Sequence, residues 1–544
     1  MLAFGTLSPR AGTILLLVAG IIISCAGVAK AGEAGVIQPN TAKKNMFNVK
    51  EYRVTGNSLL PAMRIEQAVY RYLGENKTIA DVESARAALE KAYHDAGYLT
   101  VLVNIPEQSV AGGIVQLDVT EGNVEKVRVV GSHYFLPSRI LSKVPELAEG
   151  SVPYFPGLQT QLAEANSAAD LRVTPVLRPG KTPGTVEAEL KVEDQLPLHA
   201  SIELNNYASP NTSNLRVAGM LRYDNLWQRE HSLALQYQTS PKDTNEVKVF
   251  SGTYLMPVGN SDNKLAFYAV VSHSDVATVG DMTLLGNGNI VGARWVTPLQ
   301  PGERLFHTLT LGADYKHFLN DTMLAGANTG HTPITYFPLS VAYSATMPDE
   351  TGTSAANATL NFQLPGVGDR VTECYGQVTT EFECNRYDAQ PDYMYIRGGI
   401  ERTQNLPRGL AFFARLDGQL ASGPLISNEM FTAGGADSVR GYYEAEQAGD
   451  DGARGTMELR GMQWAKGNLN DLRAVAFLEG AHLRVREALP AQTDAFNLAS
   501  TGVGLRMQAW KHLTMVLDAA WPLKDTTFTQ AGKVHFCFKA AGAF

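Results

Sequence analysis

Apolar and polar residues alternate at every second position over most of the chain after Leu198. In 308–316 the odd-numbered positions are Leu, Leu, Ala and Tyr, and the even-numbered positions are Thr, Thr, Gly, Asp and Lys. The same alternation occupies 410–420, 499–509 and 513–521. A period of two residues places the apolar side chains on one face of a β-strand. This part of the chain is therefore predicted to form strands with one apolar face and one polar face.

Several architectures use such strands. A soluble β-sandwich turns the apolar face inward, and a secreted β-solenoid would show a short strict repeat, which this sequence lacks. The stretch 197–544 is long for one sandwich. An outer-membrane barrel turns the apolar face to lipid, and it must close because an unpaired backbone group in hydrocarbon costs several kcal/mol. We predict a mainly β fold, a transmembrane antiparallel β-barrel of roughly 16 strands at about 20–22 residues per strand and loop.

The first 31 residues resemble an export signal. Arg10 lies before a short apolar run at 14–23, and Ala-Lys-Ala at 29–31 has the small-x-small pattern of a signal-peptidase site. We therefore predict a signal peptide at 1–31. An alternative interpretation is a lipobox that ends at Cys25. Either pattern takes the chain out of the cytoplasm, and no later run of the sequence has the length of a transmembrane helix.

Two segments, 47–121 and 122–196, carry the same order of predicted elements: strand, helix, helix, strand, strand. Gly-Asn at 56–57 ends the first strand of one segment, and Gly-Ser at 131–132 ends the first strand of the other. An internal repeat of about 75 residues indicates two small α+β domains in tandem. They follow a short N-terminal segment at 32–46 and precede the predicted barrel at 197–544.

Composition excludes several classes of function. The chain has a net charge of −8, and only 18% of its residues are charged, so it lacks the concentrated basic stripe of a nucleic-acid-binding protein. The sequence has no G-x-S-x-G, H-E-x-x-H, Walker loop or C-x-x-C motif, and its 11 His residues are scattered. We therefore predict no enzyme, no cofactor and no metal site.

The cysteines agree with export. Cys374 and Cys384 are ten positions apart in a polar stretch, so a small disulfide loop is expected in an oxidising compartment. No second Cys pair or His completes a metal-ligand set around them. Cys537 lies on the polar face of the last predicted strand and is interpreted as a small lumen residue.

The strongest local motif is Gly-Gly-Ala-Asp-Ser-Val-Arg-Gly-Tyr at 434–442, within a long predicted loop at about 422–453. Val439-Arg440-Gly441-Tyr442 resembles the VRGY motif in the sixth extracellular loop of the outer-membrane translocase and insertase superfamily. The tandem βααββ segments resemble POTRA domains. Two such domains before a barrel are similar to the TpsB transporters of two-partner secretion (haemolysin-activator type). The resemblance covers about 47–544.

The resemblance implies a tether inside the barrel. In this family the loop folds into the lumen and its Arg, here Arg440, pairs with an acidic residue of a Phe-x-Asp motif on the barrel wall. The matching residues here are Phe477 and Glu479, so Glu replaces Asp. The resemblance also implies that Gly441 permits a tight bend and that Tyr442 packs against the wall. The alternative interpretation is that Arg440 is an exposed loop residue.

The resemblance also implies that the POTRA domains bind an extended client. A client can add as a strand to an exposed sheet edge through main-chain hydrogen bonds. The candidate edges are 99–105, with Leu99, Val101, Val103 and Ile105, and 173–177. The alternative interpretation is that these strands only pack the domains, and the sequence does not decide between the edges.

Two further expectations concern the ends of the chain. Phe544 resembles the terminal aromatic residue that the barrel-assembly machinery reads, and it is also consistent with an aromatic girdle. TpsB transporters commonly begin with a plug helix that crosses the pore. Only about 15 residues lie between the predicted cleavage site and Phe47, whereas a helix needs about 20 residues to cross 30 Å. The hypothesis is that the plug is missing or vestigial, so that loop 6 is the main closure.

The sequence therefore predicts a pore in the outer membrane of a Gram-negative bacterium, with its POTRA domains in the periplasm. Its function would be to secrete an unfolded, TpsA-like exoprotein to the cell surface. Outer-membrane lipid and the barrel-assembly machinery are the other expected partners, and no nucleic acid is expected. Alternatives are an assembly factor for other barrels, a passive porin, and a lipid-anchored periplasmic binding protein, which would have no barrel.

Overall fold

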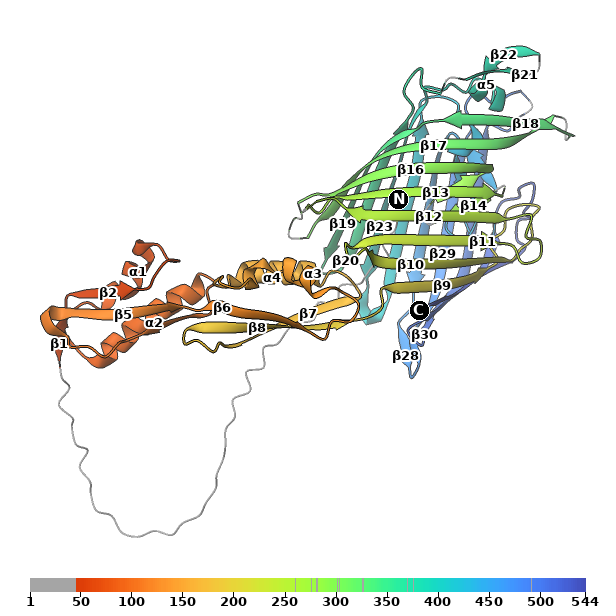
Figure 1. Cartoon of the computed structure of the whole chain (residues 1–544). Helices are drawn as coiled ribbons and strands as arrows, with labels where there is room; N and C mark the ends of the chain where they lie inside the picture. Colours follow the sequence, from red (N-terminus) through yellow and green to blue (C-terminus); the bar gives the residue numbers. More distant parts are fainter. Residues whose placement is uncertain are drawn as a thin grey trace, which may run out of the picture. The chain divides into compact units, whose positions relative to one another are not determined.

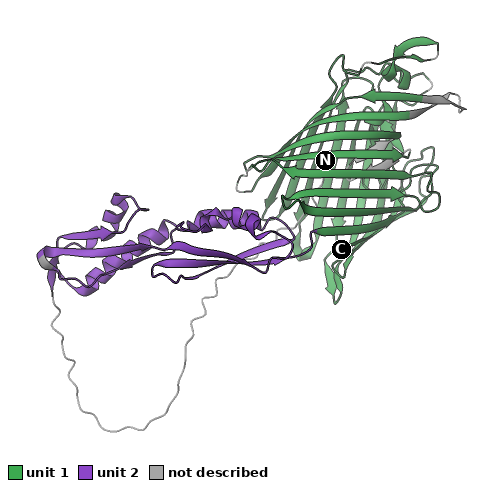
Figure 2. Cartoon of the chain, in the orientation of Figure 1, with its two compact units in different colours: residues 1–5, 198–544 green, residues 6–197 purple. Residues whose placement is uncertain are grey.

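The computed structural model describes residues 46–544 apart from 260, 275, 280–281, 301, 303, 325–326, 369, 375 and 491. The described chain forms two compact units, which meet in the sequence between Pro197 and Leu198 (Figure 2). The predicted signal peptide at 1–31 and the start of any plug lie outside the described residues. Among the described helices, none has both the length and the apolar character that a membrane crossing demands.

The N-terminal unit, unit 2 of Figure 2, begins with a strand–helix–helix–strand–strand domain. Its β-sheet has the order β2-β5-β4, in which β2 runs parallel and β4 antiparallel to β5. Helix α2 begins with a capping box formed by Thr78 and Asp81. The elements are β1 (Phe47–Val49), β2 (Glu51–Thr55), α1 (Ala62–Val69), η1 (Tyr70–Tyr72), β3 (Gly74–Lys77), α2 (Ile79–Asp95), β4 (Val101–Asn104), η2 (Ala111–Gly113) and β5 (Ile114–Glu121).

The second domain of this unit repeats the arrangement with the sheet order β6-β8-β7. Its helices bury Leu158 and Ile140 in one core with Leu190 of the central strand. The elements are β6 (Asn123–Val130), α3 (Pro137–Ser142), η3 (Pro145–Leu147), α4 (Phe155–Ala165), β7 (Leu171–Pro179) and β8 (Thr185–Asp194).

The repeat extends to individual hydrogen bonds. At the end of β5, the carboxylate of Glu121 accepts the backbone N–H groups of Ser58 and Leu59 at 2.7 and 3.0 Å. At the end of β8, the carboxylate of Asp194 accepts the backbone N–H groups of Tyr134 and Phe135 at 2.6 and 3.1 Å. In each domain an acid at the end of the central strand therefore holds the loop that leads from the first strand to the first helix.

The C-terminal unit, unit 1 of Figure 2, is a closed antiparallel barrel of 16 strands, which agrees with the predicted number. Figure 1 shows its strands side by side around the barrel. Strands β18 and β19 are one wall strand interrupted at Phe337-Pro338, and β28 is a short extension that pairs with β29. The wall strands are β9 (Leu198–Asn205), β10 (Arg216–Leu226), β11 (His231–Thr239), β12 (Lys248–Pro257), β13 (Lys264–His273), β16 (Asn287–Pro298), β17 (Phe306–Leu324), β18 (Ala327–Tyr336), β19 (Leu339–Asp349), β20 (Gly352–Phe362), β23 (Met394–Asn405), β24 (Ala411–Ala421), β27 (Asp451–Arg460), β28 (Trp464–Lys466), β29 (Leu469–Arg484), β30 (Ala495–Ala509), β31 (Leu513–Pro522) and β32 (His535–Ala543).

The last strand closes the barrel on the first. β32 pairs with β9 from Lys539, opposite Asn205, to Ala543, opposite Ser201. The backbone of Phe544 continues this ladder, since its N–H donates to the carbonyl of Ala200 at 2.8 Å. Closure leaves no free wall edge, which is the condition for strands to span hydrocarbon. A β-sandwich and a β-solenoid are therefore excluded.

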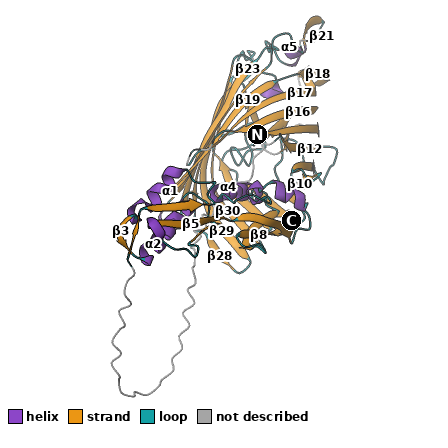
Figure 3. Cartoon of the chain, turned by 60° about the vertical axis from the view of Figure 1, so that its left-hand side comes forward, coloured by secondary structure: helices purple, strands orange, loops and turns teal. Residues whose placement is uncertain are grey.

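The exterior of the barrel is apolar, as the alternation predicts. Large apolar residues with high exposure lie on the predicted outward face of the alternating segments, for example Leu311 on β17, Leu416 on β24 and Val503 on β30. Their sequence neighbours point inward. Strands make up most of the barrel unit, and the described α-helices other than the short α5 lie in the N-terminal unit (Figure 3).

The loops of the barrel carry the remaining elements. The loop between β24 and β27, called loop 6 from here on, occupies 422–450, so the predicted limit of 453 is three residues too long because β27 already begins at Asp451. The loop elements are β14 (Val276–Val279), β15 (Met282–Leu285), β21 (Val371–Cys374), β22 (Gln377–Thr380), α5 (Glu381–Asn385), η4 (Pro407–Gly409), η5 (Ser427–Glu429), β25 (Phe431–Ala433) and β26 (Gln447–Gly449).

Candidate functional site

Loop 6 folds into the interior of the barrel and buries the predicted motif there. The side chain of Leu478 points outward and is more than half exposed, so its neighbours Phe477 and Glu479 point inward. Arg440 is only 3% exposed and Glu479 only 4%. Arg440 is therefore not an exposed loop residue, and the interpretation that places its side chain at the surface is wrong.

The structure brings Arg440 and Glu479 into direct contact. One carboxylate oxygen of Glu479 accepts hydrogen bonds from Nε of Arg440 at 2.9 Å and from a terminal nitrogen at 2.5 Å. The other oxygen accepts the backbone N–H of Arg440 at 2.7 Å. Both oxygens of one carboxylate thus hold the side chain and the main chain of the same residue, which restrains the loop in position and in orientation.

Two further carboxylates complete the site, and sequence reasoning missed both. Glu458 on β27 accepts a hydrogen bond from the Arg440 guanidinium at 2.7 Å, and Asp518 on β31 lies 3.6 Å from it. Both residues lie on the inward, polar face of their strands. That polarity is visible in the sequence, but the alternation alone does not indicate which inward acid meets the loop.

Two wall arginines balance the additional acids. Arg506 on β30 lies 2.7 Å from Asp518, and Arg460 lies 2.8 Å from Glu458. The cluster around Arg440 therefore contains three carboxylates and three guanidinium groups. We call it the Arg440 knot, and it consists of Arg440, Glu458, Arg460, Glu479, Arg506 and Asp518. Because the charges balance, the knot can be buried in the lumen without a net buried charge.

The other motif residues fix the loop beside the knot. The guanidinium carbon of Arg440 lies 3.6 Å from the centre of the Phe477 ring, a cation–π contact. Val439 is buried in an apolar cluster with Leu483 and Leu498 of the wall. Gly441 has a φ of 96°, a left-handed conformation that glycine adopts without strain.

Tyr442 connects the loop to the wall and to a neighbouring loop. Its hydroxyl lies 3.0 Å from the carbonyl of Ala499 and 2.9 Å from the carbonyl of Lys524, and the N–H of Lys524 donates to it at 3.2 Å. Tyr442 therefore packs against the wall, as the resemblance implies. It also forms hydrogen bonds with the backbone of Lys524 in the loop between β31 and β32.

The Glu-for-Asp replacement in the wall motif gives a first prediction. In Glu479→Asp the side chain is one methylene shorter, so its carboxylate can no longer reach both the guanidinium and the backbone N–H of Arg440. We expect the free energy that holds loop 6 in the Arg440 knot to fall by about 1–2 kcal/mol. A hydrogen bond to a charged group is worth about 1.5–3 kcal/mol, and the shorter side chain loses part of one such bond. A more frequently open pore in planar bilayers would show this, whereas an opening frequency equal to that of the unmodified chain would contradict it.

The first candidate docking edge, 99–105, offers fewer free backbone groups to a client strand than the sequence predicts. Only Val101 and Val103 of the four candidate residues lie in β4, since Leu99 and Ile105 fall outside it, and both valine side chains are buried in the domain core. Helix α2 also bonds this edge: the N–H of Val103 donates to Glu90 at 3.1 Å, and its carbonyl accepts from Arg86 at 3.3 Å. A client strand at this position would have to displace these side chains.

The second candidate edge is also restricted. In β7 the N–H of Val173 donates to the side chain of Asn166 at 2.6 Å, and the Asn166 amide donates to the Val173 carbonyl at 3.0 Å. Pro175 and Pro179 of the same strand have no N–H to donate. Such features protect sheet edges from strand addition.

The remaining predicted residues have well-defined positions. Cys374 and Cys384 form a disulfide that closes the β21–β22 hairpin onto α5. Cys537 is a free thiol on the inward face of β32. The ring of Phe544 is exposed and stacks on His512, with ring centres 6.4 Å apart. This position is consistent with both interpretations of the terminal aromatic residue.

Two protein-family models match the chain. The model of the ShlB-type POTRA domain matches 47–122, and that of the haemolysin secretion/activation protein ShlB/FhaC/HecB matches 184–507, which is more than half of the chain. The chain belongs to this family. It is therefore an outer-membrane pore of the two-partner secretion type, with its POTRA domains in the periplasm.

Curated relatives and solved structures agree with this assignment. The outer membrane transporter CdiB of Dickeya dadantii (strain 3937) is 20% identical over 93% of this chain and 88% of its own length. The heme/hemopexin transporter protein HuxB of Haemophilus influenzae is 20% identical over 70% of this chain and 66% of its own. The solved structure of CdiB from Escherichia coli has the same fold, with a TM-score of 0.59, 19% identity, and coverage of 95% of this chain and 93% of that one. BamA from Haemophilus ducreyi, lacking POTRA domains 1–3, also shares the fold, with a TM-score of 0.56, 14% identity, and coverage of 92% of this chain and all of that one.

Proposed function

We propose that this chain secretes an unfolded partner exoprotein through the lumen of its barrel, from the periplasm to the cell surface. Loop 6 occupies that lumen and must be held in a defined position for transport. The periplasm supplies no nucleotide, so folding of the client outside the cell is the driving force. The chain is a transporter and carries out no chemical reaction on the client.

The observation that carries this proposal is the Arg440 knot. A passive porin needs an open lumen, whereas this barrel holds a loop inside it through a buried guanidinium and three buried carboxylates. An Arg–carboxylate pair of this kind is directional and short. A charged loop in a defined position supports a regulated pore rather than a general diffusion channel.

The proposal includes client docking on the POTRA domains by strand addition. Among the described residues, no side chain bonds the backbone of β2, and none bonds residues 126–130 of β6, although both strands lie at a sheet edge. The edges at β4 and β7 are occupied by Arg86, Glu90 and Asn166. We therefore favour β2 or β6 over the two edges predicted from the sequence.

The alternative within the same superfamily is a factor that inserts other barrels into the membrane. Such a factor would act through an opening of the wall between β9 and β32, whereas secretion through the lumen leaves the wall closed. The experiment that separates the two is a disulfide across this seam. Ile202 and Gly542 are opposite each other, and a Cβ added at Gly542 would lie 3.9 Å from a methyl carbon of Ile202.

The variant Ile202→Cys with Gly542→Cys should lock the seam. The test is co-expression with a candidate exoprotein, measured as the exoprotein that reaches the cell surface under oxidising and reducing conditions. We expect equal secretion in both conditions and no secretion without the transporter. Loss of secretion that reductant restores would contradict transport through the lumen and would favour the insertion factor.

A further inference from the structure

Loop 6 itself carries buried carboxylates outside the Arg440 knot, and one of them is Glu429. The part of loop 6 that precedes the Arg440 motif is called the first arm here. Glu429 ends the short helix η5 in this arm and is 3% exposed. It accepts hydrogen bonds from Nζ of Lys316 at 2.6 Å, from the hydroxyl of Tyr336 at 2.6 Å and from the hydroxyl of Tyr395 at 2.7 Å. A buried carboxylate with three donors, one of them charged, is fully satisfied in this position.

The three donors come from a different part of the wall. Lys316 lies on β17, Tyr336 on β18 and Tyr395 on β23, whereas the carboxylates around Arg440 lie on β27, β29 and β31. Loop 6 is therefore bonded to two separate arcs of the barrel. Arg440 holds its tip against one arc, and Glu429 holds its first arm against the other.

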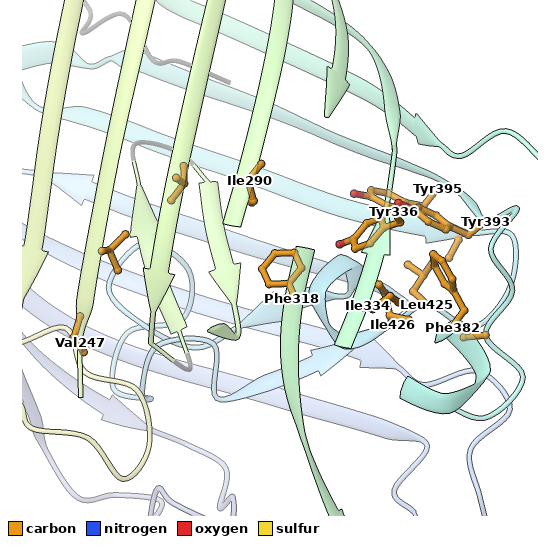
Figure 4. Packing of buried hydrophobic residues seen from close by; sticks show 14 residues of the cluster. Val247, Ile290, Phe318, Ile334, Tyr336, Phe382, Tyr393, Tyr395, Leu425 and Ile426 are labelled. Atoms are coloured by element: carbon orange, nitrogen blue, oxygen red, sulfur yellow. The ribbon is translucent and has the colours of Figure 1, made fainter. Parts of the chain in front are cut away.

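Apolar packing surrounds the Glu429 contacts. Leu425 and Ile426 of the same arm are buried in a cluster with Tyr336, Tyr393 and Phe382, the last from α5 (Figure 4). The Tyr336 ring packs edge-on against the Phe382 ring, with centres 5.7 Å apart. Burial of these rings excludes water, so the ion pair between Glu429 and Lys316 is less screened than one at the surface.

From these contacts we infer that Glu429 is a second anchor of loop 6, which keeps the first arm folded across the lumen and limits opening of the resting pore. Lys316, Tyr336 and Tyr395 are its positioning partners. An extended client needs a free path through the lumen, so the arm must leave the β17–β23 arc during transport. The Glu429 contacts must then break while the Arg440 knot can remain in place.

The matched test replaces one carboxylate by an amide in each of two variants. Glu429→Gln removes the charge that pairs with Lys316, and Asp437→Asn makes the same chemical change at an exposed position of the same loop. We expect the open fraction in planar bilayers to rise about tenfold in Glu429→Gln, which corresponds to about 1.4 kcal/mol. Asp437→Asn should behave as the unmodified chain.

A double-mutant cycle distinguishes a specific pair from a general loosening of the barrel. Lys316→Gln should raise the open fraction by a similar factor, and the double variant should open no more often than either single variant, because all three lack the same ion pair. Independent, additive effects would overturn the inference. An open fraction in Glu429→Gln equal to that in Asp437→Asn would also overturn it.

A smaller change covers the case in which Glu429→Gln does not assemble. Tyr395→Phe removes one hydroxyl donor and keeps the ring in its apolar cluster, and heat-modifiable migration on a gel reports whether the barrel has folded. We expect a folded barrel with an open fraction raised about threefold. A folded Tyr395→Phe barrel with an unchanged open fraction would count against the anchor.

Discussion

Replacement of Arg440 by alanine is expected to reduce secretion of the exoprotein at least tenfold while the barrel remains in the outer membrane. The change removes the group that Glu479 bonds with both of its oxygens. Glu458 and Asp518 keep Arg460 and Arg506 as partners, so the unpaired charge falls mainly on Glu479. Stranding one member of a buried ion pair costs about 3–5 kcal/mol, which is enough to release the tip of the loop.

Lysine at the same position should have an intermediate effect. A single ammonium group lacks the planar fork with which Arg440 bonds Glu479 and Glu458 together. The suitable control is Arg473→Ala, which removes another inward-facing arginine whose partner, Asp471, is partly exposed. Surface-exposed exoprotein, normalised to the amount of heat-modifiable barrel, is the measurement. Unreduced secretion by Arg440→Ala at a normal barrel level would refute the role assigned to Arg440.

Deletion of residues 425–450 is expected to raise the conductance of the pore several-fold. The deletion removes Arg440 and Glu429, the two charged residues through which loop 6 is anchored to the two arcs of the wall. The strands β24 and β27 remain joined by the short turn 422–424, because Gln419 and Gly452 are already paired. A barrel of 16 strands has room for an aqueous channel when nothing fills it.

The measurement is single-channel conductance in planar bilayers, with heat-modifiable migration as the check that the barrel has closed. Glu429→Gln should raise mainly the frequency of opening, whereas the deletion should raise the conductance of the open state. A conductance that the deletion leaves unchanged would mean that loop 6 is not the main closure. A different segment would then have to fill the lumen.

Local sequence patterns were sufficient to predict the architecture. In the alternating segments the direction of the side chains follows from alternation alone, and Leu311, Leu416 and Val503 all face outward as predicted. The tandem domains follow from a repeated order of elements and from the Gly-Asn and Gly-Ser pairs that end the first strand of each domain. The contact between Arg440 and Glu479 came from a family motif, because the two residues lie far apart in the sequence and no periodicity links them.

What the sequence determined by itself is what depends on neighbours along the chain: strand faces, helix starts, turns and the requirement that apolar strands close into a barrel. Tertiary structure alone decided that the inward carboxylates of Glu458 and Asp518 meet loop 6. It also decided that Lys316, Tyr336 and Tyr395 bond Glu429. It also decided that Arg86 and Glu90 cover the edge of β4. The physical reason is that these contacts depend on the register between strands and on the path of a long loop, and a short window of sequence carries neither.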